Sequence, residues 1–358
     1  MAKFKKIGIL TSGGDAPGMN ACVRAVTRKA HAEGVEVAGI IGGYSGLIND
    51  QILDLTPRMV SDIISRGGTM LYSDRCLEFK TEPGMQKAIA TCKKHGIDAL
   101  VVIGGDGTFR GGTDMTNRGV PTIGIPGTID NDITATDYTI GFDSAMTTTA
   151  NMIDCLRDTC ESHARCNVVE VMGRDCGQIA LYTALATGAV AAVIPEVPFD
   201  EAATIARIKE LKAAGKRGFV VVVSEGVRTP DGKPYSEALA AVIAKETLIE
   251  TKFARFAHVV RGGKPSLQDR LVATEMGVMA VDLLLAGQSN KVICRLDNKI
   301  VPVDINYALI TDRYYKNKLK EGDLDAFTPA EIASMKARAE QLTAEIKNVY
   351  QMIEDTSR

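Results

Sequence analysis

The chain has 358 residues, 45% of them hydrophobic and 24% charged, with a formal net charge of −2. This length favours two domains over a single hydrophobic core. The near-neutral charge argues against a nucleic-acid-binding protein, and no apolar run reaches the ~18–20 residues that a membrane span needs. The eight cysteines form no CxxC pair. We therefore expect reduced thiols in a cytoplasmic protein, without a zinc site.

Short apolar runs alternate with amphipathic stretches along the chain. The apolar runs predict strands at residues 5–10, 35–41, 98–104, 120–126, 166–173, 218–224 and 291–296. Amphipathic patterns predict a helix from Met19 onward and further helices at 85–94, 142–160, 202–213 and 267–285. Nearly continuous apolar strands are buried on both faces, as in a parallel sheet. The alternation therefore predicts an α/β fold with doubly wound sheets, which bind ligands where strands run into loops.

Three loops that combine glycine with carboxylates follow predicted strands. They are SGGDAPGMNA (12–21), GGDGT (104–108) and PGTIDND (126–132). Glycine lets a polyanion approach the backbone, and the first loop opens a helix, whose free N–H groups attract anions. An acid beside phosphates calls for a cation, so Asp106 indicates Mg²⁺. Each loop taken alone also fits an ordinary turn or strand–helix connection, and the Walker A pattern is absent.

Two carboxylates in the third loop, Asp130 and Asp132, follow shortly after Thr128. One can accept the proton of a hydroxyl nucleophile while the other holds metal or orients its partner. An Asx-rich turn is the alternative. Arginines that could bind phosphate oxygens are Arg75, Arg165, Arg174 and Arg261, with His258 three residues before the last of them. Glu225, at the end of a predicted strand, could accept hydrogen bonds from the hydroxyls of a sugar. Taken singly, each is more often a structural or surface residue.

Residues 328–358 predict one long helix. Thr328, Pro329 and Glu331 form a helix start signal. An apolar stripe then follows at Ile332, Met335, Ala339, Leu342, Ile346, Val349 and Ile353. We expect this stripe to pack onto the body of the chain or onto a neighbouring subunit, because three heptads are few for a free-standing coiled coil.

Six motifs in order, within residues 5–296, resemble the 6-phosphofructokinase family of ATP-dependent, bacterial-like enzymes. The motifs are GGDAPGMNA, GGDGT, PGTIDNDI, TIGFDSA, VVEVMGR and RGGKPSLQDR. The resemblance implies two similar lobes with the active site in the cleft between them. It implies an ATP-binding lobe at 1–141 and 260–310, a sugar-binding lobe at 142–259 and 311–327, and a helical extension at 328–358. It also implies a glycolytic kinase, expected to be an allosteric homotetramer.

The family transfers the γ-phosphoryl group of MgATP to the 1-hydroxyl of fructose 6-phosphate. The positions that match its catalytic residues are Asp130 as general base, Thr128, Asp132 and Arg174. Those that match its ATP and Mg²⁺ site are Gly14, Arg75, Cys76, Asp106, Gly107 and Thr108, with Asp106 linked to the metal. Those that match its sugar-phosphate site are Thr128, Asp130, Arg165, Met172, Gly173, Arg174, Glu225, Lys252, His258 and Arg261. In the family, positions 165 and 252 reach across from a neighbouring subunit.

The identity of the phosphoryl donor is inferred from two glycines, Gly107 and Gly127. Diphosphate-using relatives carry an acid where this chain has Gly107 and a lysine where it has Gly127, so the resemblance implies ATP. A diphosphate-dependent enzyme is the nearest alternative. Others are an NAD or lipid kinase sharing GGDGT, which would lack the arginines at 165, 174 and 261, and a non-catalytic regulatory subunit, which would lack Asp130 or Asp106.

This chain also departs from the family pattern. Lys252 replaces an arginine and cannot make a bidentate phosphate contact, and Ala257 and Val260 replace a glycine and a glutamine. At the effector site Arg24, Arg28, Arg157 and Lys216 match, whereas Pro57, Val190 and Ala214 stand where Arg, Glu and Lys are usual. Because charge-assisted contacts are lost, we expect weak or altered control by ADP and phosphoenolpyruvate.

Overall fold

The computed structural model describes residues 4–357, which divide into two compact units. Unit 1 takes the residues up to Ile129 together with Ile133–Ser144 and Arg261–Ala339. Unit 2 takes Asp130–Asp132, Ala145–Val260 and the residues from Glu340 onward. Each unit is an α/β layer structure around its own sheet, so the predicted fold class is confirmed.

Unit 1 is built on a seven-stranded sheet with the order β11-β10-β5-β4-β1-β2-β3. Its strands are β1 (Lys6–Thr11), β2 (Glu36–Ile40), β3 (Ile52–Leu55), β4 (Ala99–Gly104), β5 (Thr122–Pro126), β10 (Lys291–Leu296) and β11 (Lys299–Asp304). The five inner strands run parallel, and only the two edge strands, β3 and β11, pair antiparallel. The carboxyl ends of β1, β4 and β5 therefore lie side by side at one edge of the sheet, and all three glycine-rich loops start there.

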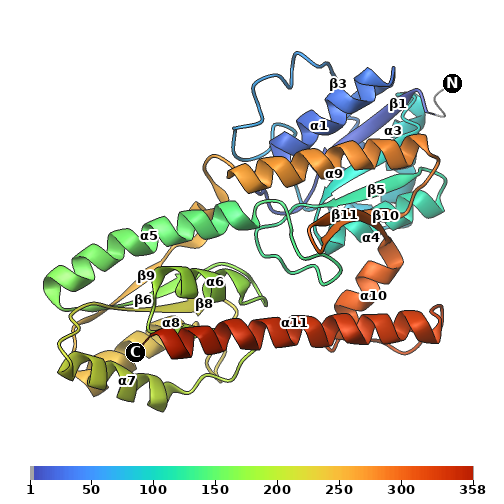
Figure 1. Cartoon of the computed structure of the whole chain (residues 1–358). Coiled ribbons are helices and arrows are strands. Elements are labelled where there is room, and N and C mark those ends of the chain that lie inside the picture. Colours follow the sequence, from blue (N-terminus) through green and yellow to red (C-terminus); the bar gives the residue numbers. More distant parts are fainter. Residues whose placement is uncertain (1–3, 358) are drawn as a thin grey trace. The chain divides into compact units, whose positions relative to one another are not determined.

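Helices cover the sheet of unit 1. They are α1 (Met19–Ala32), α2 (Gly43–Ile48), α3 (Glu82–Lys94), α4 (Asp106–Asn117), α9 (Leu267–Leu285), α10 (Ile305–Tyr315) and the short 3-10 helix η1 (Glu78–Lys80). Helix α9 packs on α1 and on β5 (Figure 1). Gly277 allows this close approach, because a Cβ atom there would lie 2.8 Å from the Cβ atom of Ala25.

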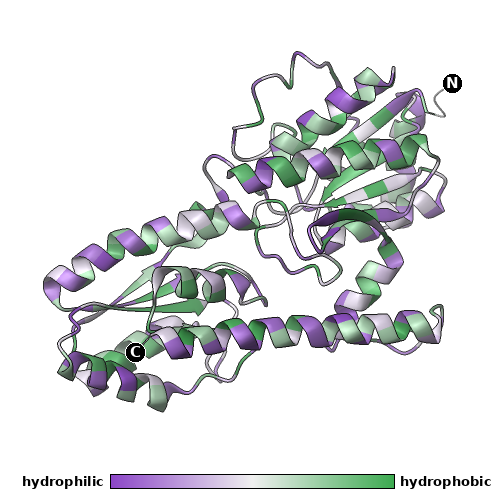
Figure 2. Cartoon of the chain, viewed as in Figure 1, coloured by the Kyte–Doolittle hydropathy of each residue, from purple (hydrophilic) through white to green (hydrophobic). Residues whose placement is uncertain are grey.

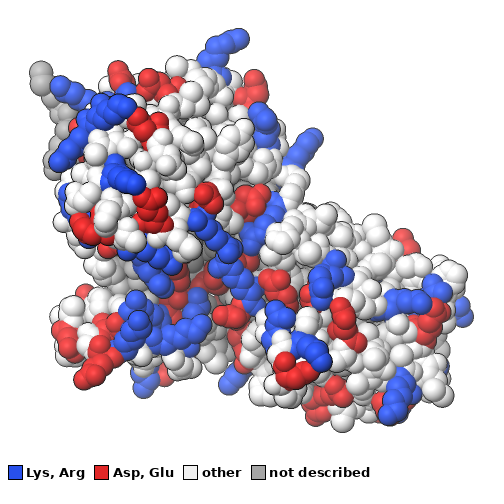
Figure 3. Space-filling model, turned by 180° about the vertical axis from the view of Figure 1, so that it is seen from behind, with Lys and Arg blue, Asp and Glu red and all other residues white. Residues whose placement is uncertain are grey.

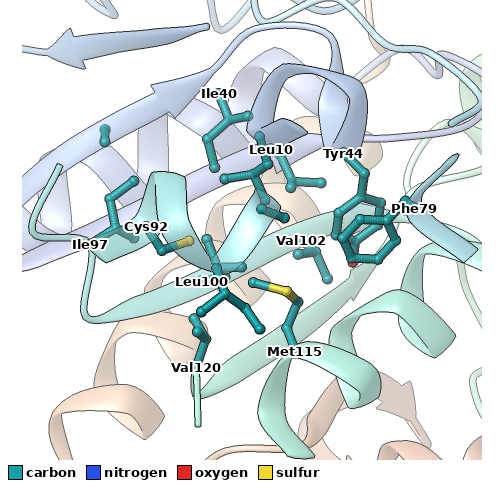
Figure 4. Packing of buried hydrophobic residues seen from close by; sticks show 14 residues of the cluster. Leu10, Ile40, Tyr44, Phe79, Cys92, Ile97, Leu100, Val102, Met115 and Val120 are labelled. Atoms are coloured by element: carbon teal, nitrogen blue, oxygen red, sulfur yellow. The ribbon is translucent and has the colours of Figure 1, made fainter. Parts of the chain in front are cut away.

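The core of unit 1 forms where alternate strand residues meet helices. Leu10, Leu100 and Val102 cluster with Cys92 of α3 and Met115 of α4 (Figure 4). Alternate residues of a strand point to the same face of the sheet, where a covering helix meets them.

A second cluster joins α10 to unit 1. Ile305 and Leu309 of α10 pack with Phe109 of α4 and Val292 of β10. The contact grouping also places residues 311–327 in unit 1.

Unit 2 has a four-stranded sheet with the order β7-β8-β6-β9, in which all strands are parallel. Its strands are β6 (Cys166–Val171), β7 (Ala191–Val193), β8 (Phe219–Ser224) and β9 (Thr251–Arg255), and its helices are α6 (Gln178–Thr187), α7 (Glu201–Ala213) and α8 (Tyr235–Thr247). Val168, Phe219 and Val221 pack with Ile243 of α8 in its core. The strands of both sheets are mostly green in Figure 2, in keeping with burial on both faces.

Two long helices contribute residues to both units: α5 (Phe142–His163) and α11 (Pro329–Thr356). The short 3-10 helix η2 (Ala257–Arg261) belongs to unit 2 except for its last residue, Arg261, with which unit 1 resumes. Helix α11 confirms the predicted start signal, because Thr328 N donates to the Glu331 carboxylate at 2.8 Å and Glu331 N donates to Thr328 Oγ1 at 3.3 Å. Met335, Ile346 and Ile353 of its apolar stripe are buried. The stripe therefore packs onto this chain itself.

The surface carries both signs of charge. Lysine and arginine side chains are interspersed with aspartate and glutamate on the face shown in Figure 3, as a net charge of −2 leads one to expect. Among residues 4–357, no helix is both long and apolar enough to cross a bilayer.

Candidate active site

The first two glycine-rich loops contact each other in unit 1. Ser12 N donates to Ile103 O at 3.0 Å, and Thr108 Oγ1 donates to Ser12 O at 3.3 Å. Gly104 makes this contact possible, because a Cβ atom there would lie 2.4 Å from Ser12 O. The loops predicted separately from the sequence thus form one surface at the edge of the sheet.

Asp106 is the first residue of α4, and Gly105 caps that helix without a side-chain hydrogen bond. A Cβ atom at Gly105 or Gly107 would meet nothing within 4 Å. The half-buried Asp106 carboxylate therefore lies beside backbone that a phosphate chain can approach.

These features fit Mg²⁺, which takes oxygen ligands from one or two carboxylates and completes its shell with phosphate and water oxygens. The described residues contain no group of three or more metal-binding side chains. An ion held by Asp106 would thus depend on a bound phosphate for further ligands.

A third segment of unit 1 joins this surface and carries Arg75 and Cys76. Thr11 Oγ1 donates to Tyr72 O at 2.7 Å, and Ser73 Oγ donates to Gly13 O at 2.7 Å. These bonds hold the segment against the glycine turn after β1. Arg75 is exposed and Cys76 half-buried, so both residues predicted for ATP binding stand beside the loops.

Arg261 lies at the same glycine turn. Its Nη1 donates to Asp15 O at 3.0 Å, and a Cβ atom at Gly14 would lie 2.7 Å from that nitrogen. The side chain is mostly buried, with 9% of the residue exposed. The sequence assigns Arg261 to the sugar phosphate, whereas in unit 1 it lies against the turn assigned to ATP.

The third loop begins in unit 1 and supplies Asp130 to unit 2. Gly127 N donates to Gly104 O at 3.0 Å, and Thr128 O accepts from Thr139 Oγ1 at 2.6 Å. Thr128 is therefore fixed next to the GGDGT loop. Asp130 follows two residues later, and two residues of extended chain span at most ~7 Å between Cα atoms. The Cα atom of Asp130 therefore lies within about 7 Å of the Cα atom of Thr128.

Within unit 2, Asp130 is buried, with 1% of the residue exposed, and it pairs with an arginine. Arg174 Nε lies 3.4 Å from Asp130 Oδ2, while half of the arginine side chain stays accessible. A buried carboxylate beside a reachable guanidinium can accept a proton at one atom and stabilise transferred negative charge at the other.

Glu225 positions the loop that carries Arg174. Its Oε1 accepts hydrogen bonds from Gly173 N at 3.2 Å and Arg174 N at 3.0 Å. Arg174 has φ 52° and Gly173 has φ 144°, so this turn uses left-handed backbone. Met172, buried at the end of β6, precedes it. The structure thus brings Arg174 beside Asp130, and Glu225 beside the backbone of Gly173 and Arg174.

Arg165 and Lys252 are brought together elsewhere. Arg165 Nε lies 2.7 Å and Lys252 Nζ 2.9 Å from the two oxygens of Glu250. Arg165, then Lys252, lowers the pKa of Glu250 to about 2. These residues precede or begin the parallel strands β6 and β9, so the length of β6, about 20 Å at ~3.3 Å per residue, separates them from Arg174.

His258 is exposed in η2 next to Ala257. Ala257 has φ 46°, in the left-handed region that favours glycine. The alanine therefore adopts this conformation at an energetic cost that a glycine would not have. Arg255, which also lies nearby, is engaged with the buried Glu170 at 2.5 Å.

The positions that the resemblance assigns to an effector site lie in both units. In unit 1, Arg28 Nη2 donates to Pro57 O at 3.4 Å and to Ser61 Oγ at 3.3 Å. In unit 2, burial and then Arg157 lower the pKa of Lys216. There, too, Val190 is buried, and its carbonyl accepts from Arg207 at 3.1 Å. The backbone carbonyls of Pro57 and Val190 thus both accept hydrogen bonds from arginines.

One buried acid was missed by the sequence analysis. Asp269 accepts from Tyr138 Oη at 2.6 Å and Gly141 N at 2.7 Å, and from Ser144 N at 2.9 Å and Ser144 Oγ at 2.5 Å. Burial raises its pKa, and the Ser144 and Tyr138 hydrogen bonds oppose that rise. Asp269 thereby ties two of the six motifs together. Its place within the last motif was the only available signal.

Comparison with known proteins places these features in context. The family model Phosphofructokinase matches residues 6–284. The ATP-dependent 6-phosphofructokinase 1 of Clostridium perfringens (strain 13 / Type A) is 49% identical over 318 residues, 89% of this chain and 98% of that protein. The ATP-dependent 6-phosphofructokinase of Bacillus subtilis (strain 168) is 50% identical over 302 residues, 84% of this chain and 93% of that protein.

Solved structures agree in fold. Phosphofructokinase from Saccharomyces cerevisiae matches with a TM-score of 0.86 at 30% identity, covering 99% of this chain and 50% of the yeast chain. This chain therefore spans about half the length of the yeast protein. The pyrophosphate-dependent phosphofructokinase of Marinobacter aquaeolei matches with a TM-score of 0.75 at 22% identity, covering 84% of this chain and 83% of that one. The family model and the two relatives of about half-identical sequence show that this chain belongs to the phosphofructokinase family.

Proposed function

We propose that this chain transfers the γ-phosphoryl group of MgATP to the 1-hydroxyl of fructose 6-phosphate, giving fructose 1,6-bisphosphate and ADP as in glycolysis. The observation that carries the proposal is the buried Asp130 carboxylate beside Arg174, two residues along the chain from Thr128 at the glycine-rich surface. An acid held in that position serves proton removal from a sugar hydroxyl.

In unit 1 the ATP phosphates lie along the glycine-rich surface. Backbone N–H groups at the start of α4 and at the turn of Gly14 donate to phosphate oxygens, and Arg75 adds a positive charge. Thr128 contacts the transferred group. Mg²⁺, held by Asp106 when bound, supplies neutralisation of the charge on the phosphate chain.

In unit 2 the acceptor sugar is bound for attack. The oxygen of the 1-hydroxyl forms a bond to the γ-phosphorus, the bond from that phosphorus to the bridging oxygen of ADP breaks, and the hydroxyl proton passes to Asp130. Arg174 stabilises the negative charge of the transferring group, and Asp132 supports the base. Glu225, Met172, Gly173 and His258 hold the sugar phosphate.

Two glycines support ATP over diphosphate as the donor. At Gly127, a Cβ atom would lie 2.9 Å from a methyl group of Ile103, so a lysine would require the core to move. At Gly107 the space is open, and an acidic side chain would extend into the approach of the phosphates. The close relatives named as ATP-dependent enzymes support the same choice.

Self-association completes the proposal. Arg165 and Lys252 lie a strand length away from Arg174 in the same chain, which supports a homotetramer in which they bind the 6-phosphate of a neighbouring copy. The eight free cysteines support a location in the reducing cytoplasm.

Steady-state kinetics test the proposal directly. The rate of fructose 1,6-bisphosphate formation is measured against fructose 6-phosphate with MgATP and with magnesium diphosphate as separate donors. We expect turnover with ATP and less than a hundredth of that rate with diphosphate. Turnover with diphosphate that is as fast as with ATP, or faster, would show that the donor is diphosphate. Absence of product with both donors would contradict the proposed function. The variant Gly107→Asp tests the donor assignment, because its acidic side chain should raise KM for ATP more than it raises KM for fructose 6-phosphate.

A further inference from the structure

A pair of amide side chains lies next to the proposed base in unit 2. Asn131 Nδ2 donates to Gln178 Oε1 at 2.7 Å, and Gln178 Nε2 donates to Asn131 O at the longer distance of 3.5 Å. The Gln178 side chain thus makes a strong hydrogen bond with the Asn131 side chain and a weak one with the Asn131 backbone carbonyl. Asn131 is the residue between Asp130 and Asp132, so this contact acts on the peptide that links the two carboxylates.

The backbone at Asn131 needs such support. Its φ is 48°, in the left-handed region, and the residue is 8% exposed. Asparagine adopts this conformation more readily than other residues apart from glycine, but the conformation still competes with others. A hydrogen bond from a fixed partner would select one conformation of the turn and hence one direction of the Asp130 carboxylate.

Gln178 is attached to a rigid part of unit 2. It is the first residue of α6, directly after Gly177, whose N–H donates to Glu196 Oε1 at 2.8 Å. A Cβ atom at Gly177 would lie 2.4 Å from Ile194 Cβ, so the start of the helix is pressed against the segment after β7. Burial raises the pKa of Glu196, and the Gly177 N–H opposes that rise. The helix start is therefore held on two sides.

We propose that Gln178 is a positioning residue for phosphoryl transfer: through Asn131 it holds the Asp130 carboxylate at Arg174 in the orientation that accepts the hydroxyl proton. The inference rests on the proposed function, since it needs Asp130 to be the base. Gln178 touches neither substrate nor reacting atom in this role. Its effect appears in kcat, because it acts on the reacting geometry rather than on the binding of ATP.

Three variants separate the contacts. Gln178→Ala removes both hydrogen bonds, and we expect kcat to fall about 5–20-fold with KM for ATP within twofold of wild type. Gln178→Glu keeps the acceptor for Asn131 Nδ2 and loses only the long contact, so kcat at high pH should stay within about threefold. Its added negative charge should raise the pKa of Asp130 and move the acid limb of the kcat–pH profile to higher pH.

Asn131→Gly tests the other side of the pair, because glycine keeps the left-handed backbone and loses the amide. Combined with Gln178→Ala, it should lose no more kcat than the more severe single variant, since both remove the hydrogen bond between Asn131 Nδ2 and Gln178 Oε1. Gln351→Ala, at an exposed glutamine of α11 bonded to Asp355 at 2.9 Å, is the control and should match wild type.

Wild-type turnover of fructose 6-phosphate is measured first, so that failure of the proposed function is seen before any variant is made. With wild type active, kcat within twofold of wild type for Gln178→Ala would overturn the proposal. Equal losses of kcat in the alanine and glutamate variants, or fully additive losses in the double variant, would also overturn it. If Gln178→Ala does not fold, the profile of Gln178→Glu and the kcat of Asn131→Gly decide: an unmoved acid limb and an unchanged kcat contradict the proposal.

Discussion

Replacing Asp269 with asparagine should destabilise unit 1 strongly. The carboxylate is fully buried and receives four hydrogen bonds, two on Oδ1 from Tyr138 and Gly141 and two on Oδ2 from Ser144. In either orientation of the new amide, its NH₂ group faces a backbone N–H, of Gly141 or of Ser144, which cannot reverse its role. A hydroxyl can turn to accept, so the loss is less than all four bonds.

The cost follows from these contacts. One buried N–H left without an acceptor costs about 1–3 kcal/mol, and the remaining bonds lose the assistance of the charge, so we expect a total of about 3–5 kcal/mol. At roughly 2–4 °C per kcal/mol for a protein of this size, the melting temperature should fall by about 6–20 °C. Thermal unfolding followed by circular dichroism measures this change.

A matched control lies on the same helix. Asp282 is half exposed and pairs with Lys29 at 2.9 Å, so Asp282→Asn should cost less than ~1 kcal/mol. A fall of less than about 2 °C for Asp269→Asn, or equal falls for the two variants, would refute the reasoning that this buried acid ties the two motifs together.

Further predictions concern the departures from the family pattern and the tail. Ala257→Gly relieves a φ of 46° and should stabilise the protein by about 0.5–1 kcal/mol, measured as a higher melting temperature; a lower one would contradict the strain. Glu250→Gln frees Arg165 and Lys252 for a phosphate, so KM for fructose 6-phosphate should fall about 2–5-fold, and an increase would argue against their proposed role. Because the pKa of Glu250 is lowered from 4.5 to about 2, the wild-type ion pairs persist at pH 7 and are lost only as the pH falls through that window, which NMR titration of the Glu250 carboxyl checks. Ending the chain at Phe327 removes helix α11, whose apolar stripe packs onto this chain. The melting temperature should therefore fall, while size-exclusion chromatography with light scattering should show an unchanged oligomeric state. Dissociation into smaller species would instead place α11 at a subunit interface.

The sequence predicted the parts of the fold that local patterns determine. All seven apolar runs are strands, and the helix predicted at 267–285 matches α9 in both bounds. Buried parallel strands carry this signal, because burial on both faces leaves no polar interruption. The strands β3, β7, β9 and β11 were missed. All four are edge strands, and β3, β9 and β11 expose polar side chains, so their pattern does not stand out from that of loops.

The sequence predicted the chemistry of the candidate site better than it predicted which residues lie next to one another. Glycines beside carboxylates at the ends of predicted strands indicated a site that binds phosphate and a metal ion. The structure joins the first two of these loops through the hydrogen bond between Thr108 and Ser12. Where long side chains point could not be predicted, because it depends on packing between segments remote in sequence. Arg261 contacts the turn at Asp15, and Asp269 collects donors more than a hundred residues away.

The most direct test of the account is the turnover of Asp130→Asn with MgATP and fructose 6-phosphate, measured beside binding of the sugar phosphate by calorimetry. An asparagine keeps the shape of the buried side chain but cannot take the hydroxyl proton. We predict that kcat falls by about 10²–10⁴-fold while the protein stays folded and fructose 6-phosphate still binds. A variant that retains more than a tenth of the wild-type kcat would contradict the assignment of Asp130 as the base.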